Sequence, residues 1–86
     1  MNNYQRFQGK LVVVTGGNGI GAATAERFAA EGATVAVMDL DCRQIQDKVA
    51  YALSGDCTDD AQLSEFFDTV QRQWSSVDVL FNNVGQ

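Results

Sequence analysis

The stretch KLVVVTGGNGIG, residues 10–21, joins a short run of β-branched apolar residues to a cluster of glycines. Such a run, ending abruptly at glycine, is typical of a strand buried on both faces, so residues 10–15 are predicted to form one. Residues 20–31 (IGAATAERFAAE) are rich in alanine, with apolar positions at helical spacing, and Gly32 follows as a stop signal. Residues 35–39 (VAVMD) give a second buried strand. The sequence therefore predicts a strand, a helix and a parallel strand joined by a right-handed crossover.

The stretch after the second strand allows two interpretations. Ile45, Val49 and Leu53 fit one face of a helix, while residues 49–54 (VAYALS) also fit a strand. We favour a short helix over residues 41–47 that is followed by the third strand. This choice keeps the alternation of strands and helices that begins at the glycine cluster.

A longer helix and a fourth strand complete the pattern. Thr58 or Asp59 can cap the helix, which is predicted to extend to about Trp74. Its apolar side chains recur at steps of three or four, which favours core packing over an aromatic binding patch; they are Leu63, Phe66, Phe67, Val70 and Trp74. Residues 77–81 (VDVLF) form the fourth strand. The predicted fold is α/β, a three-layer doubly wound parallel sheet of the Rossmann type with strand order 3-2-1-4.

The composition indicates a folded, acidic protein and restricts its partners. Six basic against eleven acidic residues give a net charge of -5, which repels nucleic-acid phosphates and anionic lipid surfaces. No apolar run approaches the roughly 20 residues that span a bilayer, and the first residues lack the apolar stretch of a signal peptide. We therefore expect a cytoplasmic protein without nucleic-acid or membrane partners. Cys42 and Cys57 are expected to be reduced thiols, and without histidine no metal site is predicted.

The glycine-rich turn at residues 15–21 (TGGNGIG) has the features of a phosphate site. Glycine lets a ligand approach the backbone, and the first N–H groups of a helix have no partners within it. Asp39 ends the next strand 18 residues after Gly21, near the spacing at which a carboxylate binds the ribose of a dinucleotide. An acid there repels the 2′-phosphate of NADP, and Asn18 adds no positive charge, so NAD is the predicted cofactor. Taken alone, a glycine turn is more often structural, and Asp39 more often a solvated strand end.

Four landmarks in order resemble those of the short-chain dehydrogenase/reductase family. They are the turn TGGNGIG with the following AATAERFAAEGATV, then Asp39, GDCTD at residues 55–59, and VDVLFNNVG at residues 77–85. The resemblance extends over nearly the whole chain from Gly9 onward. It implies that residues 1–86 are part of a NAD-binding Rossmann domain.

The resemblance also implies roles for individual residues. In the family, the acid at the place of Asp56 binds the adenine amino group, and the next residue, here Cys57, contacts the ring through its backbone. The alternative role of Asp56 is that of a turn or helix-capping residue. Residues 82–85 (NNVG) match the Asn-Asn-Ala-Gly element that closes the cofactor cleft. The predicted cofactor-binding residues are Gly16, Asn18, Gly19, Ile20, Gly21, Asp39, Asp56, Cys57, Asn82, Asn83 and Gly85.

The chain departs from the family pattern in its connections. The family usually has three residues between the first and second glycines of the turn, whereas only two separate Gly16 from Gly19. We therefore expect the backbone of the turn to follow a different path. The connection from Asp39 to Asp56 is short for a full helix and strand, and Val84 replaces a smaller alanine near the ribose site.

No catalytic residue is predicted in this chain. The family chemistry uses a serine and a tyrosine followed four positions later by a lysine, all beyond the Asn-Asn-Ala-Gly element. Tyr4 is followed at that position by Gln8, and Tyr51 by Gly55. The first functional hypothesis is the cofactor-binding portion of an NAD-dependent oxidoreductase, whose complete form acts on an alcohol or ketone. The alternatives are a non-catalytic dinucleotide-binding module and an inactive remnant, with homo-oligomers expected through an open apolar strand at residues 77–81.

Overall fold

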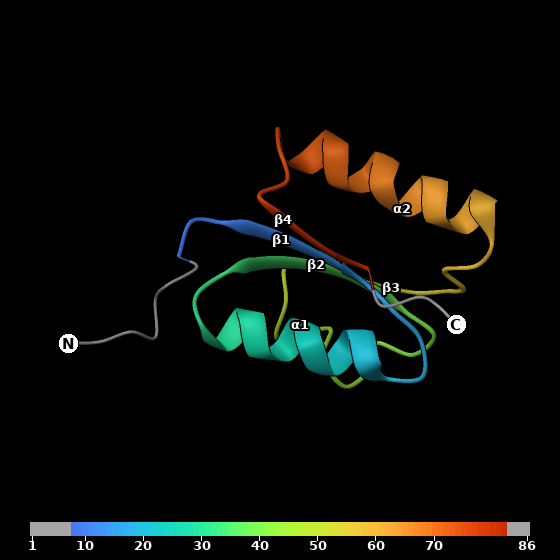
Figure 1. The fold of residues 1–86 in the computed structure, drawn as a ribbon, viewed down its shortest axis with the longest axis horizontal. Helices are drawn as coiled ribbons and strands as arrows, with labels where there is room; N and C mark the ends of the chain where they lie inside the picture. Colours follow the sequence, from blue (N-terminus) through green and yellow to red (C-terminus); the bar gives the residue numbers. More distant parts are fainter. Residues whose placement is uncertain (1–7, 83–86) are drawn as a thin grey trace.

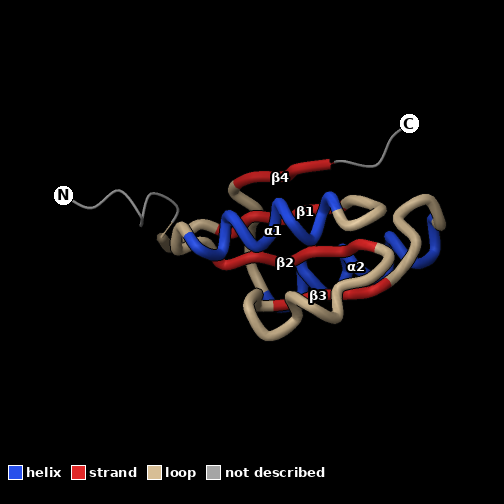
Figure 2. Tube along the Cα trace, turned by 90° about the horizontal axis from the view of Figure 1, so that it is seen from below, coloured by secondary structure: helices blue, strands red, loops and turns tan. Residues whose placement is uncertain are grey.

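The computed structural model describes residues 8–82, which form a parallel sheet flanked by two helices (Figure 1). The strands lie in the order β3-β2-β1-β4, and their bounds are Leu11–Thr15 for β1, Thr34–Asp39 for β2, Tyr51–Ser54 for β3 and Val79–Asn82 for β4. Figure 2 shows β3 and β4 at opposite edges of the sheet. The predicted Rossmann-type architecture and strand order are confirmed.

The two helices lie on opposite faces of the sheet. Helix α1, Ile20–Ala30, connects β1 to β2 on the lower face in Figure 1, and helix α2, Asp60–Gln73, lies between β3 and β4 on the upper face. Side chains alternate along the central strand β1, so that Val12 packs toward α1 and Val13 packs toward α2. Both side chains are fully buried, as expected for a strand that is covered on both faces.

The two faces of the sheet are packed with side chains of different size. On the α2 side, the fully buried Phe66 lies with its ring centroid 5.7 Å from Tyr51 and 5.3 Å from Phe67. On the α1 side, the fully buried Ala25 lets the helix approach the sheet closely. Burial of one large side chain such as Phe66 contributes about 1.5–3 kcal/mol to folding.

Helix α2 begins at a defined cap. The side chain of Asp59 accepts hydrogen bonds from the backbone N–H groups of Ala61 at 3.0 Å and Gln62 at 3.1 Å. Asp59 rather than Thr58 is therefore the cap, which decides between the two predicted candidates. The helix ends at Gln73, one residue before the predicted end.

Strand β4 begins later than the sequence suggested. Asp78 precedes it, and the Asp78 carboxylate accepts a hydrogen bond of 2.8 Å from the N–H of Leu11, while its own N–H donates to the Leu11 carbonyl at 3.0 Å. These two bonds join the start of β4 to the start of β1. The strand then extends to Asn82, one residue beyond the predicted end.

The predicted short helix over residues 41–47 is wrong. The segment consists of hydrogen-bonded turns, in which the N–H of Ile45 bonds the carbonyl of Cys42 and the N–H of Lys48 bonds that of Ile45. Eleven residues separate β2 from β3, fewer than the dozen that a crossover between parallel strands usually needs. The segment instead places Cys42 and Ile45, both almost fully buried, onto the α1 side of the sheet.

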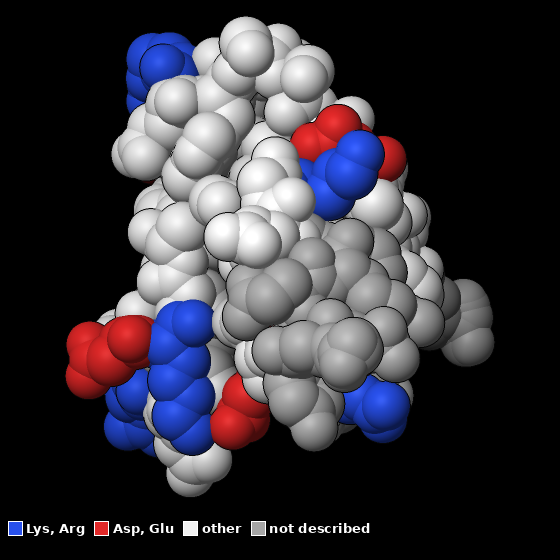
Figure 3. Space-filling model, turned by 90° about the vertical axis from the view of Figure 1, so that its left-hand side faces the viewer, with Lys and Arg blue, Asp and Glu red and all other residues white. Residues whose placement is uncertain are grey.

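Charges of both signs are interspersed on the surface. Figure 3 shows Lys and Arg side chains beside Asp and Glu side chains on the face at the amino ends of the strands. Among residues 8–82, Arg43 pairs with Asp41 at 2.8 Å and Lys48 pairs with Glu26 at 2.9 Å. Neither helix of the described segment has the length and apolar character needed to cross a membrane.

Candidate functional site

The candidate site lies where the parallel strands end. The glycine turn leaves β1 here, and the N–H of Gly16 donates to the carbonyl of Met38 at the end of β2 over 2.9 Å. Asn18 and Gly19 both adopt the left-handed region, with φ of 57° and 86°. Asparagine tolerates this conformation better than most side chains, and glycine adopts it freely. The turn thereby delivers the chain directly into the first turn of α1.

The side chain of Asp39 points into this turn. Its carboxylate accepts hydrogen bonds from the backbone N–H of Gly19 at 3.3 Å, from that of Ala22 at 3.0 Å, and from that of Leu40. Asp39 is fully buried. Since Gly19 has no side chain to cap α1, the carboxylate of Asp39 acts as the cap from a neighbouring strand. A carboxylate at the amino end of a helix is also favoured by the helix dipole.

Gly21 is packed between these groups. A Cβ atom at Gly21 would lie 3.0 Å from an oxygen of Asp39 and 3.1 Å from the backbone of Gly16. No larger residue fits between the turn and the end of β2 without displacing one of them. By contrast, a Cβ atom on Gly17 or Gly19 would meet nothing within 4 Å. The turn therefore has one tightly packed side and one open side.

The open side of the turn retains unused donors. Among residues 8–82, the backbone N–H groups of Gly17 and Asn18 have no hydrogen-bond partner. Free N–H groups before a helix form an anion site, and they fit the diphosphate of a dinucleotide cofactor. The neighbouring Ile20 is 55% exposed at the start of α1.

The segment after β3 joins the same region. The N–H of Gly55 donates to the carbonyl of Asp39 at 2.8 Å, and the Sγ of Cys57 lies 3.4 Å from the carbonyl of Met38, which also receives the bond from Gly16. The structure thus brings Gly16, Asp39 and Cys57 together at the carboxyl end of the sheet. Cys57 is buried.

Asp56 is exposed, and one of its two carboxylate oxygens accepts hydrogen bonds. One oxygen of its carboxylate accepts hydrogen bonds from the hydroxyl of Thr58 at 2.6 Å and the N–H of Thr58 at 2.9 Å, and these bonds lower the pKa of Asp56. Asp56 therefore forms a turn, as in the alternative role considered above. Its second oxygen has no partner among the described residues and can accept from an amino group.

The end of β4 borders the candidate site next to the end of β1. The hydroxyl of Thr15 donates to the side-chain carbonyl of Asn82 at 3.0 Å, which ties β4 to β1. A hollow of about 280 Å³ opens beside this pair; its lining residues are Thr15, Cys57, Leu63, Phe67, Leu80 and Asn82. Asn83 and Gly85, which were also predicted to bind cofactor, lie outside the described residues.

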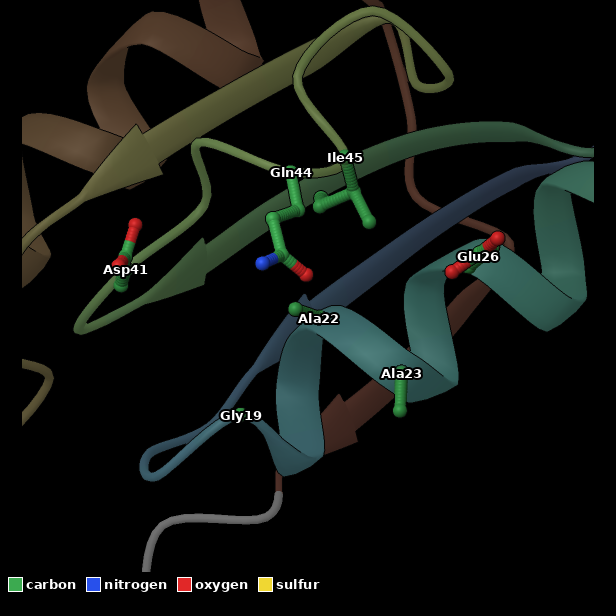
Figure 4. Close-up of a pocket in the computed structure, with 7 residues that line it drawn as sticks. All are labelled: Gly19, Ala22, Ala23, Glu26, Asp41, Gln44 and Ile45. Carbon is green, nitrogen blue, oxygen red and sulfur yellow. The ribbon is translucent and has the colours of Figure 1, made fainter.

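A second pocket, of about 320 Å³, lies beside the turn between α1 and the segment after β2 (Figure 4). It is lined by Gly19, Ala22, Ala23, Glu26, Asp41, Gln44 and Ile45. In Figure 4 the amide of Gln44 extends toward Ala22 on the first turn of α1, and Asp41 points away near the tip of β2. Gln44 could not be found from the sequence, because a lone exposed glutamine in an irregular segment carries no periodicity and matches no motif.

The acidic residues of this pocket are paired with cations. Arg43 donates two side-chain hydrogen bonds to Asp41, at 2.9 and 2.8 Å, and this contact lowers the pKa of Asp41 to about 2. Lys48 pairs with Glu26 across the pocket wall. No group of three or more metal-ligating side chains is found among residues 8–82.

The sequence matches known proteins over almost its whole length. Residues 10–86 match the family model described as short chain dehydrogenase. The chain belongs to the short-chain dehydrogenase family. It is similar to meso-2,3-butanediol dehydrogenase of Serratia marcescens, with 39% identity over 93% of this chain and 35% of that protein. It is also similar to levodione reductase of Leifsonia aquatica, with 32% identity over 93% of this chain and 34% of that protein.

A third relative is an alcohol dehydrogenase that uses NADP. The NADP-dependent (R)-specific alcohol dehydrogenase of Lentilactobacillus kefiri is 33% identical over 93% of this chain and 35% of that protein. The chain spans about a third of the length of these curated relatives. The family is one of oxidoreductases that use nicotinamide dinucleotide cofactors, and the chain corresponds to the part that contains the glycine turn.

Proposed function

We propose that this chain is the cofactor-binding segment of an oxidoreductase and that its cofactor is NAD. One observation carries the proposal: an open glycine turn with free N–H groups at Gly17 and Asn18 leads directly into α1 at the carboxyl end of the sheet. Ligands of open parallel sheets bind at this end, where the chain order reverses between β1 and β4. The diphosphate would rest on the turn, and Asp56 and Cys57 would meet the adenine.

The preference for NAD over NADP rests on the charges around the turn. Asp41 and Glu26 line the pocket beside the turn, and the buried carboxylate of Asp39 is bonded to the turn itself. The nearby Arg43 and Lys48 are already paired with carboxylates. A 2′-phosphate would add negative charge where no free cation of the described segment compensates it. One like-charge contact near the surface is worth about 1 kcal/mol or more, so NAD should bind on the order of tenfold more tightly than NADP.

Isothermal titration of the 86-residue chain with NAD and with NADP tests both parts of the proposal. Saturable binding of NAD, with weaker binding of NADP, is the expected result. Equal affinities would disprove the argument from charge, while leaving cofactor binding intact. Failure to bind either dinucleotide would favour the alternative of an inactive remnant. The buried position of Asp39 and the shortened turn are the two features that support this alternative.

In a complete oxidoreductase, NAD would accept or donate the hydride, and an alcohol or ketone would be the substrate. The residues of this chain would bind and orient the cofactor, and none of them is proposed to react. The protein is proposed to act in the cytoplasm, since both cysteines are free thiols as expected in a reducing compartment.

A further inference from the structure

The side chain of Gln62, in the first turn of α2, reaches back to the segment that follows β3. Its Oε1 accepts a hydrogen bond of 3.0 Å from the backbone N–H of Asp56. Gln62 is the third residue of α2, a position from which a glutamine usually bonds the N–H of the capping residue. Here the N–H of the cap, Asp59, is already bonded to the carbonyl of Asp56 at 3.0 Å. The amide of Gln62 therefore fixes the segment before the helix rather than the helix itself.

The same side chain packs against Gly55. A Cβ atom at Gly55 would lie 2.8 Å from the Oε1 of Gln62 and 3.0 Å from the Cε of Met38. Met38 is fully buried near the end of β2, and the N–H of Gly55 donates to the carbonyl of Asp39 at 2.8 Å. The backbone at Gly55 is therefore held between the sheet on one side and the amide of Gln62 on the other.

The two residues that follow Gly55 present a free acceptor and a free donor. The second carboxylate oxygen of Asp56 has no partner among residues 8–82, and neither has the backbone N–H of Cys57. The edge of adenine that carries the amino group donates from that group and accepts at the adjacent ring nitrogen, which complements this pair. In hypoxanthine the same edge carries an oxygen and a protonated nitrogen, so donor and acceptor are exchanged. A segment held in this position can therefore distinguish the two purines.

We propose that Gln62 is a positioning residue that holds Asp56 and Cys57 in place for the adenine of the cofactor and thereby sets the preference for adenine over hypoxanthine. The inference rests on the proposed function, in which Asp56 and Cys57 meet the adenine. Gln62 acts through the backbone, because its Oε1 is occupied by the N–H of Asp56. Without this acceptor the segment would adopt further conformations, in which the free oxygen and the free N–H no longer match one edge of the purine.

The test compares two nucleotides that differ only in the purine ring. ADP and inosine 5′-diphosphate are titrated calorimetrically into the wild-type chain, Gln62→Leu, Gln62→Glu and the control Gln71→Leu, which alters an exposed glutamine near the other end of α2. The wild-type chain and Gln71→Leu should bind ADP about tenfold more tightly than inosine diphosphate. In Gln62→Leu, which has no acceptor, this ratio should fall to about two. Gln62→Glu should retain the ratio, because its carboxylate keeps an acceptor at the same place.

A measurement without nucleotide tests the hydrogen bond itself. Hydrogen exchange of the Asp56 amide, followed by NMR of the ¹⁵N-labelled chains, should be at least about threefold faster in Gln62→Leu than in the wild type. Gln62→Glu and Gln71→Leu should stay close to the wild-type rate. An unchanged rate at Asp56 in Gln62→Leu would overturn the positioning role.

The titrations separate this role from a purely structural one. Equal loss of affinity for both nucleotides in Gln62→Leu, with the ratio unchanged, would overturn the inference, as would loss of the ratio in Gln62→Glu or in Gln71→Leu. A wild-type chain that binds both nucleotides equally well would also overturn it, while leaving nucleotide binding intact. If the wild-type chain binds neither nucleotide, the proposed function fails and this inference fails with it. Circular dichroism establishes whether Gln62→Leu is folded; if it is not, Gln62→Ala provides the same comparison.

Discussion

Three backbone N–H groups converge on the carboxylate of Asp39, and two of them belong to the turn and first turn of α1. The sequence predicted that an acid would end β2 beside the glycine turn, and the structure places it there. Its orientation could not be predicted, because it depends on the exact path of a turn in which two residues separate Gly16 from Gly19. At this position a carboxylate can face either outward to a ligand or inward to the helix.

Replacement of Asp39 by alanine should reduce the free energy of unfolding by about 1–3 kcal/mol, because the substitution removes the cap of α1 and leaves buried donors without a partner. Urea denaturation followed by circular dichroism measures the loss. The matched control is Asp41→Ala, which removes an exposed carboxylate that bonds only Arg43 and its backbone. Equal stability of Asp39→Ala and the wild type would contradict the capping role.

The two thiols are predicted to be inert and to link stability to alkaline pH. Burial raises the pKa of Cys42 and of Cys57 above the ordinary value of 9.0. Well below pH 9 the thiols are protonated in both the folded and the unfolded chain, and stability is unaffected. As the pH rises past 9 the unfolded thiols lose protons first, so the free energy of unfolding should fall.

Labelling with a thiol reagent at pH 8 checks this prediction directly. Both thiols should react slowly in the native chain and rapidly in urea. A Cys42→Ala, Cys57→Ala double variant should lose part of the alkaline decrease in stability. Equally fast labelling in buffer and in urea would show that the cysteines are not buried as described.

Among the elements, the strands and helices with long, regular patterns of apolar residues were predicted well. Residues 11–14 and 35–38 are apolar throughout, since they pass between two helical layers. The structure places β1 and β2 within one residue of the predicted bounds. The connection at residues 41–47 was predicted wrongly. Its apolar residues recur at helical spacing, but only eleven residues connect β2 to β3, and this short connection folds into turns. The spacing of apolar residues alone does not show where the two strands end and begin.

The anchoring of this connection can be tested at Ile45. Replacement by alanine should destabilise the chain by about 2–4 kcal/mol, because a nearly buried side chain is removed from the cluster beneath α1. Thermal unfolding of Ile45→Ala and of the exposed neighbour Gln46→Ala gives the comparison. If the two variants are equally stable, the connection is not anchored by Ile45.

At the scale of the whole molecule, β4 is the more exposed of the two edge strands of the described sheet. It pairs with β1 on one side, and Leu80 and Phe81 are 56% and 42% exposed. An unpaired strand edge with apolar side chains favours association with another strand. We therefore propose that the 86-residue chain associates with itself through β4, which is consistent with the expectation from the sequence.

Sedimentation velocity over a range of concentrations tests this association. Leu80→Lys should weaken it by at least about tenfold, because a charge at the edge opposes burial there. The matched control is Leu40→Lys, since Leu40 is 53% exposed at the end of β2 and lies away from β4. A wild-type chain that stays monomeric at every concentration would contradict the proposal.

A nicotinamide dinucleotide is proposed to bind at the glycine turn and the amino end of α1. Amide spectra of the ¹⁵N-labelled chain, recorded by NMR during titration with NAD, test it residue by residue. Saturable shifts are expected at Gly17, Asn18 and Gly19, whose backbone N–H groups lie in the turn. Spectra in which these signals stay fixed, or in which the shifts occur only at distant residues, would contradict it.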